Sequence, residues 1–176
     1  LRALGATNFS ALDGTQIGGL STTQIQGLSL SEVGGLTATD IGEFAETQIA
    51  ALASTQIAAL SATAFSTLDS TAIGALSSTQ LKGVTATQLA GITATALSAF
   101  TSTEIGLLAT TQLAALSTTN LAALDDTQVG GLTSTQIGAL TSTTFSALTA
   151  TQIGDLSTTQ IAGITAVDPL DQEIAD

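Results

Sequence analysis

The side chains of this 176-residue sequence that could do chemistry are almost all carboxylates. Fourteen Asp and Glu residues accompany two basic residues, Arg2 and Lys82, and the chain contains no His and no Cys. Without His the sequence lacks the commonest general base, and its many Ser hydroxyls have no partner to activate them. Most of the carboxylates are scattered over positions that we expect to be exposed, where a charge mainly confers solubility. We therefore expect no enzymatic activity and no cofactor.

The densest group of carboxylates lies at the C-terminal end of the sequence. Carboxylate oxygens are the ligands that calcium prefers, but the spacing here matches no EF-hand loop. A solvated linker or capping segment is the favoured interpretation, and a calcium-bound junction is the alternative. The residues that could bind calcium are Asp168, Asp171, Glu173 and Asp176.

Charge and hydropathy argue against two classes of partner. The net charge is −12, and two basic residues cannot neutralise a phosphate backbone, so we expect no binding to nucleic acid. An anionic membrane surface would also repel the chain. Although 44% of the residues are hydrophobic, no run of about eighteen apolar residues occurs, and we expect no insertion into a membrane.

An eight-residue repeat organises the chain and must position all of these side chains. It gives twenty complete octads from Leu4 to Gly163, and a twenty-first opens at Ile164 and breaks. Positions one and six are always apolar, position four is nearly always Thr, position five is most often Gln, and the last two are mostly small. We divide the chain into a start at 1–3, a repeat array at 4–166 and an acidic tail at 167–176. We expect it to be part of a longer array.

Each octad carries the signals that begin a short helix. In the octad that opens at Leu132, Thr133 can cap the helix while Gln136 reaches back to the amide of the cap, which is a capping box. Leu132 and Ile137 have the spacing of a hydrophobic staple, and Leu140 follows Ile137 on the same helical face. Because the next start comes eight residues later, no helix can exceed about a turn and a half. Further caps are predicted at Ser21, Asp69 and Ser157.

A single octad cannot fold alone. Ordering its backbone costs roughly 8–16 kcal/mol, whereas two buried apolar side chains return about 3–6 kcal/mol and a cap about 1 kcal/mol. Stability must come from stacking, so we predict an all-α solenoid of very short helices whose anchors, such as Leu132, Ile137 and Leu140, are buried by neighbouring octads. The alternative fold is a β-solenoid with two octads in each 16-residue coil, which β-branched Thr and Ile would favour.

A longer period of 56 residues, or seven octads, lies over the octads. Asp occupies position two only at Asp13, Asp69 and Asp125, and Phe44 and Phe100 share the same interval. Gene duplication is the favoured interpretation, and a superhelical turn of seven octads is the alternative.

The near-invariant Thr at position four also has two interpretations. Its hydroxyl could bond an open carbonyl of the preceding helix and form a ladder along the stack. Alternatively, pairs such as Thr133 and Thr135 spell Thr-x-Thr, which resembles the motif of β-solenoid antifreeze proteins and would imply an ice-binding module.

The consensus Leu-[Ser/Thr]-x-Thr-Gln-[Ile/Leu]-[Gly/Ala]-[Gly/Ala], repeated from Leu4 to Ile164, resembles the short-repeat regions of large secreted bacterial surface proteins that are adhesin-like. The resemblance implies an extracellular, cell-surface location and a non-catalytic role as a rod, stalk or spacer. An uncapped solenoid exposes its core at both ends, so lateral or end-to-end self-association into filaments is a further expectation. An adhesive, ligand-binding surface is the other alternative.

Overall fold

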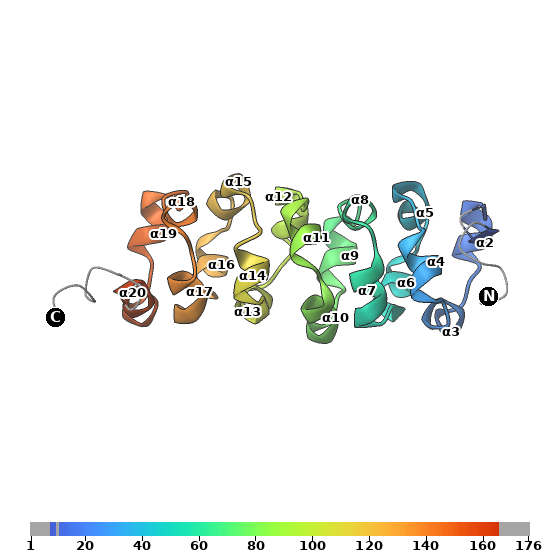
Figure 1. Cartoon of the computed structure of the whole chain (residues 1–176), viewed down its shortest axis with the longest axis horizontal. Helices are drawn as coiled ribbons and strands as arrows, with labels where there is room; N and C mark the ends of the chain where they lie inside the picture. Colours follow the sequence, from blue (N-terminus) through green and yellow to red (C-terminus); the bar gives the residue numbers. More distant parts are fainter. Residues whose placement is uncertain (1–7, 10, 166–176) are drawn as a thin grey trace, which may run out of the picture.

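The computed structural model describes residues 8, 9 and 11–165, and a new helix begins every eight residues (Figure 1). The helices are α2 (Gly14–Gly18), α3 (Thr22–Gln26), α4 (Leu30–Gly34), α5 (Ala38–Gly42), α6 (Glu46–Ala51), α7 (Ser54–Ala59), α8 (Ala62–Phe65), α9 (Ser70–Gly74), α10 (Ser78–Gly83), α11 (Ala86–Ala90), α12 (Ala94–Leu97), α13 (Ser102–Leu107), α14 (Thr110–Leu113), α15 (Thr118–Ala122), α16 (Asp126–Gly130), α17 (Ser134–Gly138), α18 (Ser142–Phe145), α19 (Ala150–Gly154) and α20 (Thr158–Thr165).

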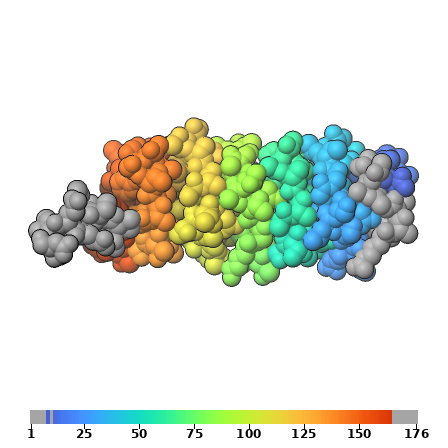
Figure 2. Space-filling view, viewed as in Figure 1, coloured from blue at the N-terminus to red at the C-terminus, as the bar shows by residue number. Residues whose placement is uncertain are grey.

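These helices stack into a narrow rod. Figure 1 shows α2 near one end of the long axis and α20 near the other, and Figure 2 shows the sequence running in order along the axis. Within the described residues there is no strand, so the predicted all-α solenoid is confirmed and the β-solenoid alternative is wrong. The Gln-Ile segments are helical because the N-cap side chain of most octads satisfies a free amide at the start of the helix locally; α6, α7 and α14 have Ala at the N-cap and no such bond.

The start and the end of each helix are set by neighbouring residues of the octad. At α17 the Thr133 hydroxyl accepts from the Gln136 amide at 3.1 Å, and the Thr133 amide donates to Gln136 Oε1 at 2.7 Å. At the other end, the Leu140 amide donates to the Ile137 carbonyl at 3.1 Å. The N-cap has extended backbone angles, with φ −77° and ψ 158° at Thr133, so the chain changes direction before each new helix.

Positions one and six form a continuous core along the rod. Leu132 and Ile137 are buried, and Leu140 is partly buried against the same core. Each octad therefore contributes two anchors to a core that its neighbours complete, as one-dimensional stacking requires.

The chain winds with about three and a half octads in each turn. Each helix packs on the helix three further along the chain, for example α4 on α7, α7 on α10, and α17 on α20. Side-chain amides at position five reach back to backbone carbonyls 28 and 31 residues earlier. Twenty-eight residues are three and a half octads, so seven octads make about two turns. The proposed single turn of seven octads is therefore wrong, and residues 56 apart lie on the same side of the rod.

Glycine at position eight permits the closest approach between turns. A Cβ atom built on Gly131 would overlap the carbonyl group of Ser102, and one built on Gly163 would overlap that of Ser134. At these two positions the backbones are too close for any side chain, so the small residues at the octad end are a packing requirement.

Candidate functional site

The joint between successive turns is made by the buried glutamines of position five. Gln136 keeps its Oε1 on the amide of its own cap, while its Nε2 donates to the carbonyls of Ile105 at 2.9 Å and Leu108 at 2.7 Å. One side chain therefore begins its own helix and also bonds the turn below. The same cross-turn bonds are made by Gln48, Gln56, Gln80, Gln88, Gln112, Gln128, Gln152 and Gln160.

Sequence reasoning assigned these glutamines to capping alone and missed the bonds between turns. One signal could have revealed them: a capping box accepts Glu as readily as Gln at its third helical position, yet this sequence strongly prefers Gln. Of the two side chains, only Gln carries N–H groups. A preference for Gln over Glu therefore indicates that the Nε2 end of the side chain must donate a hydrogen bond.

Positions where Gln is replaced change the joint in three ways. Asn120 is shorter and reaches only the carbonyl of Ile92, at 2.7 Å. Glu104 keeps the cap bond, since its Oε2 accepts from the Thr101 amide at 2.8 Å, but a carboxylate cannot donate to a carbonyl. Alanine removes both functions, and this occurs at Ala64, Ala72 and Ala96.

Glu32 is a special case of a carboxylate in the joint. Its side chain is buried, and Oε2 accepts from the amide and the hydroxyl of Ser29, both at 2.7 Å. The other oxygen, Oε1, is buried with no hydrogen-bond partner in the described part of the chain. The carbonyls that a Gln would reach from this position belong to Leu1 and Leu4, which lie outside the described residues.

The predicted caps and anchors occupy these roles along the rod. Ser21 Oγ accepts from the Gln24 amide at 3.3 Å, Asp69 Oδ1 from the Ala72 amide at 2.8 Å, and Ser157 Oγ from the Gln160 amide at 3.3 Å. These bonds are structural, and none brings reactive groups together.

Position four faces solvent. Its side chain is exposed in every octad that the structure describes, and none of these Thr hydroxyls hydrogen-bonds to another described residue. The predicted hydroxyl ladder is therefore wrong. Position four is the residue before the Gln that points into the joint, and a helix turns successive side chains by about 100°, so the Thr side chain points outward.

The carboxylates form no metal site in the residues that can be assessed. Between residues 8 and 165, position 10 aside, no three Asp or Glu side chains lie close enough to hold an ion. The calcium candidates Asp168, Asp171, Glu173 and Asp176 lie outside the described residues, so this prediction remains open. None of the described helices is long and apolar enough to cross a bilayer.

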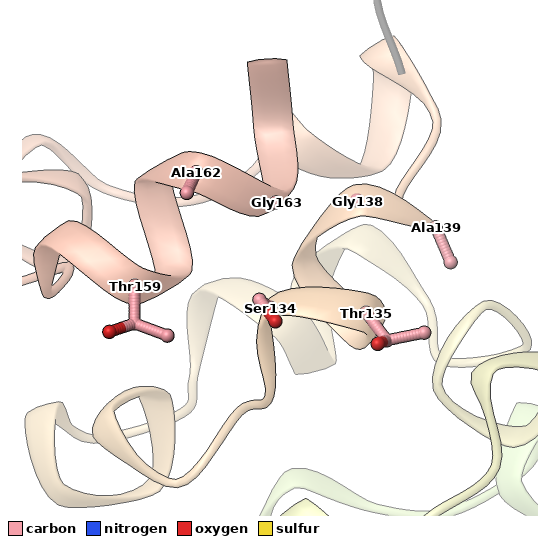
Figure 3. Close-up of a pocket in the computed structure, with 7 residues that line it drawn as sticks. All are labelled: Ser134, Thr135, Gly138, Ala139, Thr159, Ala162 and Gly163. Carbon is pink, nitrogen blue, oxygen red and sulfur yellow. The ribbon is translucent and has the colours of Figure 1, made fainter. Parts of the chain in front are cut away.

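A shallow hollow of about 560 Å³ lies between α17 and α20 (Figure 3). Only small side chains and glycines line it, with Thr135 on α17, Ala139 directly after α17, and Thr159 and Ala162 on α20. It offers no charged or aromatic group that could recognise a ligand.

The last described turn exposes apolar side chains that are buried elsewhere. Ile153 and Ile161, both at position six, are 40% and 45% exposed, whereas Ile137 at the same position is 2% exposed. Position six is therefore covered by the turn that follows it along the chain.

Residues 105–142 match the family model described as the ALTTAQ repeat. This stretch covers α14 to α17 and supports the assignment of a short-repeat region. No curated protein and no solved structure matches the chain.

Proposed function

We propose that this chain is a non-catalytic structural repeat segment that serves as a rod, stalk or spacer in a secreted bacterial surface protein. The observation that carries the proposal is the joint at position five: wherever a Gln occupies that position from Gln48 to Gln160, the same side-chain amide donates to the same two backbone carbonyls of the preceding turn. A molecule whose turns are connected by a recurring joint can grow in length without changing its cross-section. A spacer requires that property and needs no reactive site.

Three further observations support this function. The match to a repeat family in residues 105–142 favours a structural repeat. The described carboxylates do not gather into a metal-binding group. The polar outer surface of Thr and Ser, with a net charge of −12, favours a rod that stays solvated.

A length series tests the rod. One or two extra copies of residues 69–124 can be inserted after Leu124, because a whole number of octads preserves the repeat register. Small-angle X-ray scattering should give a constant cross-sectional radius and a maximum dimension that grows equally with each copy. A cross-section that widens with length would overturn the proposal.

The surface location has its own test, since antibodies against the chain should label intact cells of the bacterium that makes it.

Ice binding is a second candidate, because position four exposes a Thr in each complete octad from Leu36 to Gly163. The winding opposes it: with about three and a half octads in each turn, these threonines are distributed around the rod and do not form one flat face. A thermal-hysteresis measurement on the purified chain decides between the two, and ice-growth inhibition would favour the second candidate.

A further inference from the structure

A cavity of about 290 Å³ lies where the joint lacks its glutamine at Ala72. Ala72, which is buried, lines the cavity, and so do Ile41 and Phe44. These two are the residues 31 and 28 positions before Ala72, so they hold the carbonyls that a Gln at position 72 would reach. Glu46 and Asp69, both exposed, also line the cavity.

Three backbone groups of the residues around this cavity lack the hydrogen bonds that a Gln at position 72 would make. Asp69 caps α9 by accepting from the Ala72 amide at 2.8 Å, but its own amide has no acceptor in the described structure. The Phe44 carbonyl receives no hydrogen bond there, and the Ile41 carbonyl accepts only from backbone amides, those of Glu43 and, at 3.2 Å, Phe44. The residues that line the cavity therefore include one backbone N–H without an acceptor, that of Asp69, and two carbonyls, those of Ile41 and Phe44, that receive no side-chain donor in the described structure.

The chain contains a filled copy of the same site 56 residues later. There Gln128 stands in place of Ala72, and its Oε1 accepts from the Asp125 amide at 3.1 Å. Its Nε2 donates to the carbonyls of Leu97 at 3.0 Å and Phe100 at 2.8 Å, which correspond to Ile41 and Phe44. The Leu97 carbonyl also accepts from the Phe100 amide, as the Ile41 carbonyl does from Phe44. The two sites thus have the same donor and acceptors, and only one holds an amide.

We infer that the Ala72 cavity binds a primary carboxamide, supplied either by a small aliphatic amide or by a glutamine side chain of a peptide. The carboxamide oxygen would accept from the Asp69 amide, and its NH2 group would donate to the carbonyls of Ile41 and Phe44. Other head groups fit the pattern less well. A carboxylate would face two carbonyl oxygens and the acids Glu46 and Asp69, an ammonium has no acceptor for the Asp69 amide, and a tertiary amide has no N–H.

Access to the cavity comes from the exposed side of α5. A Cβ atom built on Gly42, which lines the cavity, would meet no atom within 4 Å, so the space beside it is open. The corresponding residue of the filled site is Ser98. The vacant site is therefore more open than its filled counterpart in two respects, since it lacks both the Gln side chain and the Ser side chain.

The experiment is an NMR titration of the full chain with propionamide, followed through the backbone amides. The resonances of Asp69, Ala72 and Phe44 should shift together and saturate in roughly the millimolar range expected for a ligand of this size. N,N-dimethylpropionamide and propionate are the matched probes, and each should shift these resonances at least tenfold less at equal concentration. Equal shifts with the dimethyl compound, or no saturable shift with propionamide, would overturn the inference, the latter because water alone would then fill the cavity.

Two variants fix the location of the site. Ala72→Gln supplies the amide from the chain itself and should abolish the propionamide response while retaining the fold. Gln128→Ala opens the second copy and should add a saturating response at Asp125 and Phe100. A response that persists at Asp69 in Ala72→Gln would contradict the inference.

A competition experiment tells a peptide ligand from a free amide. It compares a blocked tripeptide with a central Gln to the same peptide carrying Glu. If the amide comes from a side chain, only the Gln peptide should compete with propionamide.

Discussion

The side-chain amide of Gln88 lies 2.8 Å from the carbonyl oxygen of Ile57, thirty-one residues earlier in the chain. The same nitrogen lies 2.8 Å from the Leu60 carbonyl, and Oε1 accepts from the Thr85 amide at 2.8 Å. One amide group thus satisfies three backbone groups from two turns. This arrangement decides which substitutions the rod tolerates.

Replacement of Gln88 by alanine should destabilise the rod by about 2–4 kcal/mol, because the two carbonyl bonds are buried and the partly buried Thr85 amide also loses this acceptor. Gln24→Ala is the matched control: Gln24 is exposed and accepts from the Ser21 amide at 2.8 Å, but makes no cross-turn bond to a described residue. Its loss should cost about 1 kcal/mol or less. Urea denaturation measures both, and equal losses would show that capping alone explains Gln88.

Glu104→Gln should stabilise the chain by about 1 kcal/mol, because the new amide can donate to the carbonyls of Ile73 and Leu76 while keeping the bond to Thr101. Glu46→Gln removes the same charge from an exposed position outside the joint. A similar rise in the midpoint of thermal unfolding for both variants would attribute the effect to net charge instead of the joint.

Gly131→Ala and Gly130→Ala should have opposite effects although the two glycines are adjacent. A Cβ at position 131 overlaps the backbone of Ser102, so we expect a loss of about 1–3 kcal/mol. A Cβ at position 130 meets no atom within 4 Å, and alanine there should be neutral or add about 0.5–1 kcal/mol by restricting the unfolded chain. Chemical denaturation of the two variants tests the close approach between turns.

Ile137→Ala should cost about 2–4 kcal/mol, because Ile137 is buried between turns. Ile161→Ala at the same octad position should cost less than half as much, since Ile161 is 45% exposed in the last described turn. Comparable losses measured by denaturation would mean that Ile161 is covered in solution by another segment or by a second molecule.

Thr135→Ala should leave the stability within about 0.5 kcal/mol, because the Thr135 side chain is exposed and its hydroxyl makes no bond to a described residue. Thr133→Ala, two residues earlier, removes the cap of α17 and should cost about 1 kcal/mol. If both variants lose about 1 kcal/mol in thermal or urea unfolding, the hydroxyl of Thr135 must take part in a bond after all.

The local structure could be predicted from the sequence, because helix starts depend on residues three or four apart. Thr133 and Gln136 specify their capping box without reference to any other part of the chain, and Leu132 and Ile137 specify the buried pair. The stacking of octads also followed, since no isolated octad could be stable.

The relation between turns could not be predicted in the same way. The bond from Gln136 to Ile105 joins residues 31 apart, and nothing in a single octad states how many octads separate stacked helices. The outward direction of the position-four Thr depends on the same geometry, because the inward side of the helix is already taken by Gln136 and Ile137. The winding brings residues 56 apart, such as Asp69 and Asp125, to the same side of the rod, while gene duplication as the origin of the 56-residue period stays a prediction.

The winding of about three and a half octads in each turn also has a consequence for how such a molecule lengthens over generations. With about three and a half octads in each turn, seven octads are the smallest whole number that brings the chain back close to its original direction around the axis. A recombination event that copies seven octads therefore extends the shaft while keeping its two tips in the same mutual orientation. Three or four octads differ from one full turn by about half an octad. Copying that number would therefore rotate one tip relative to the other by the angle that half an octad spans around the axis.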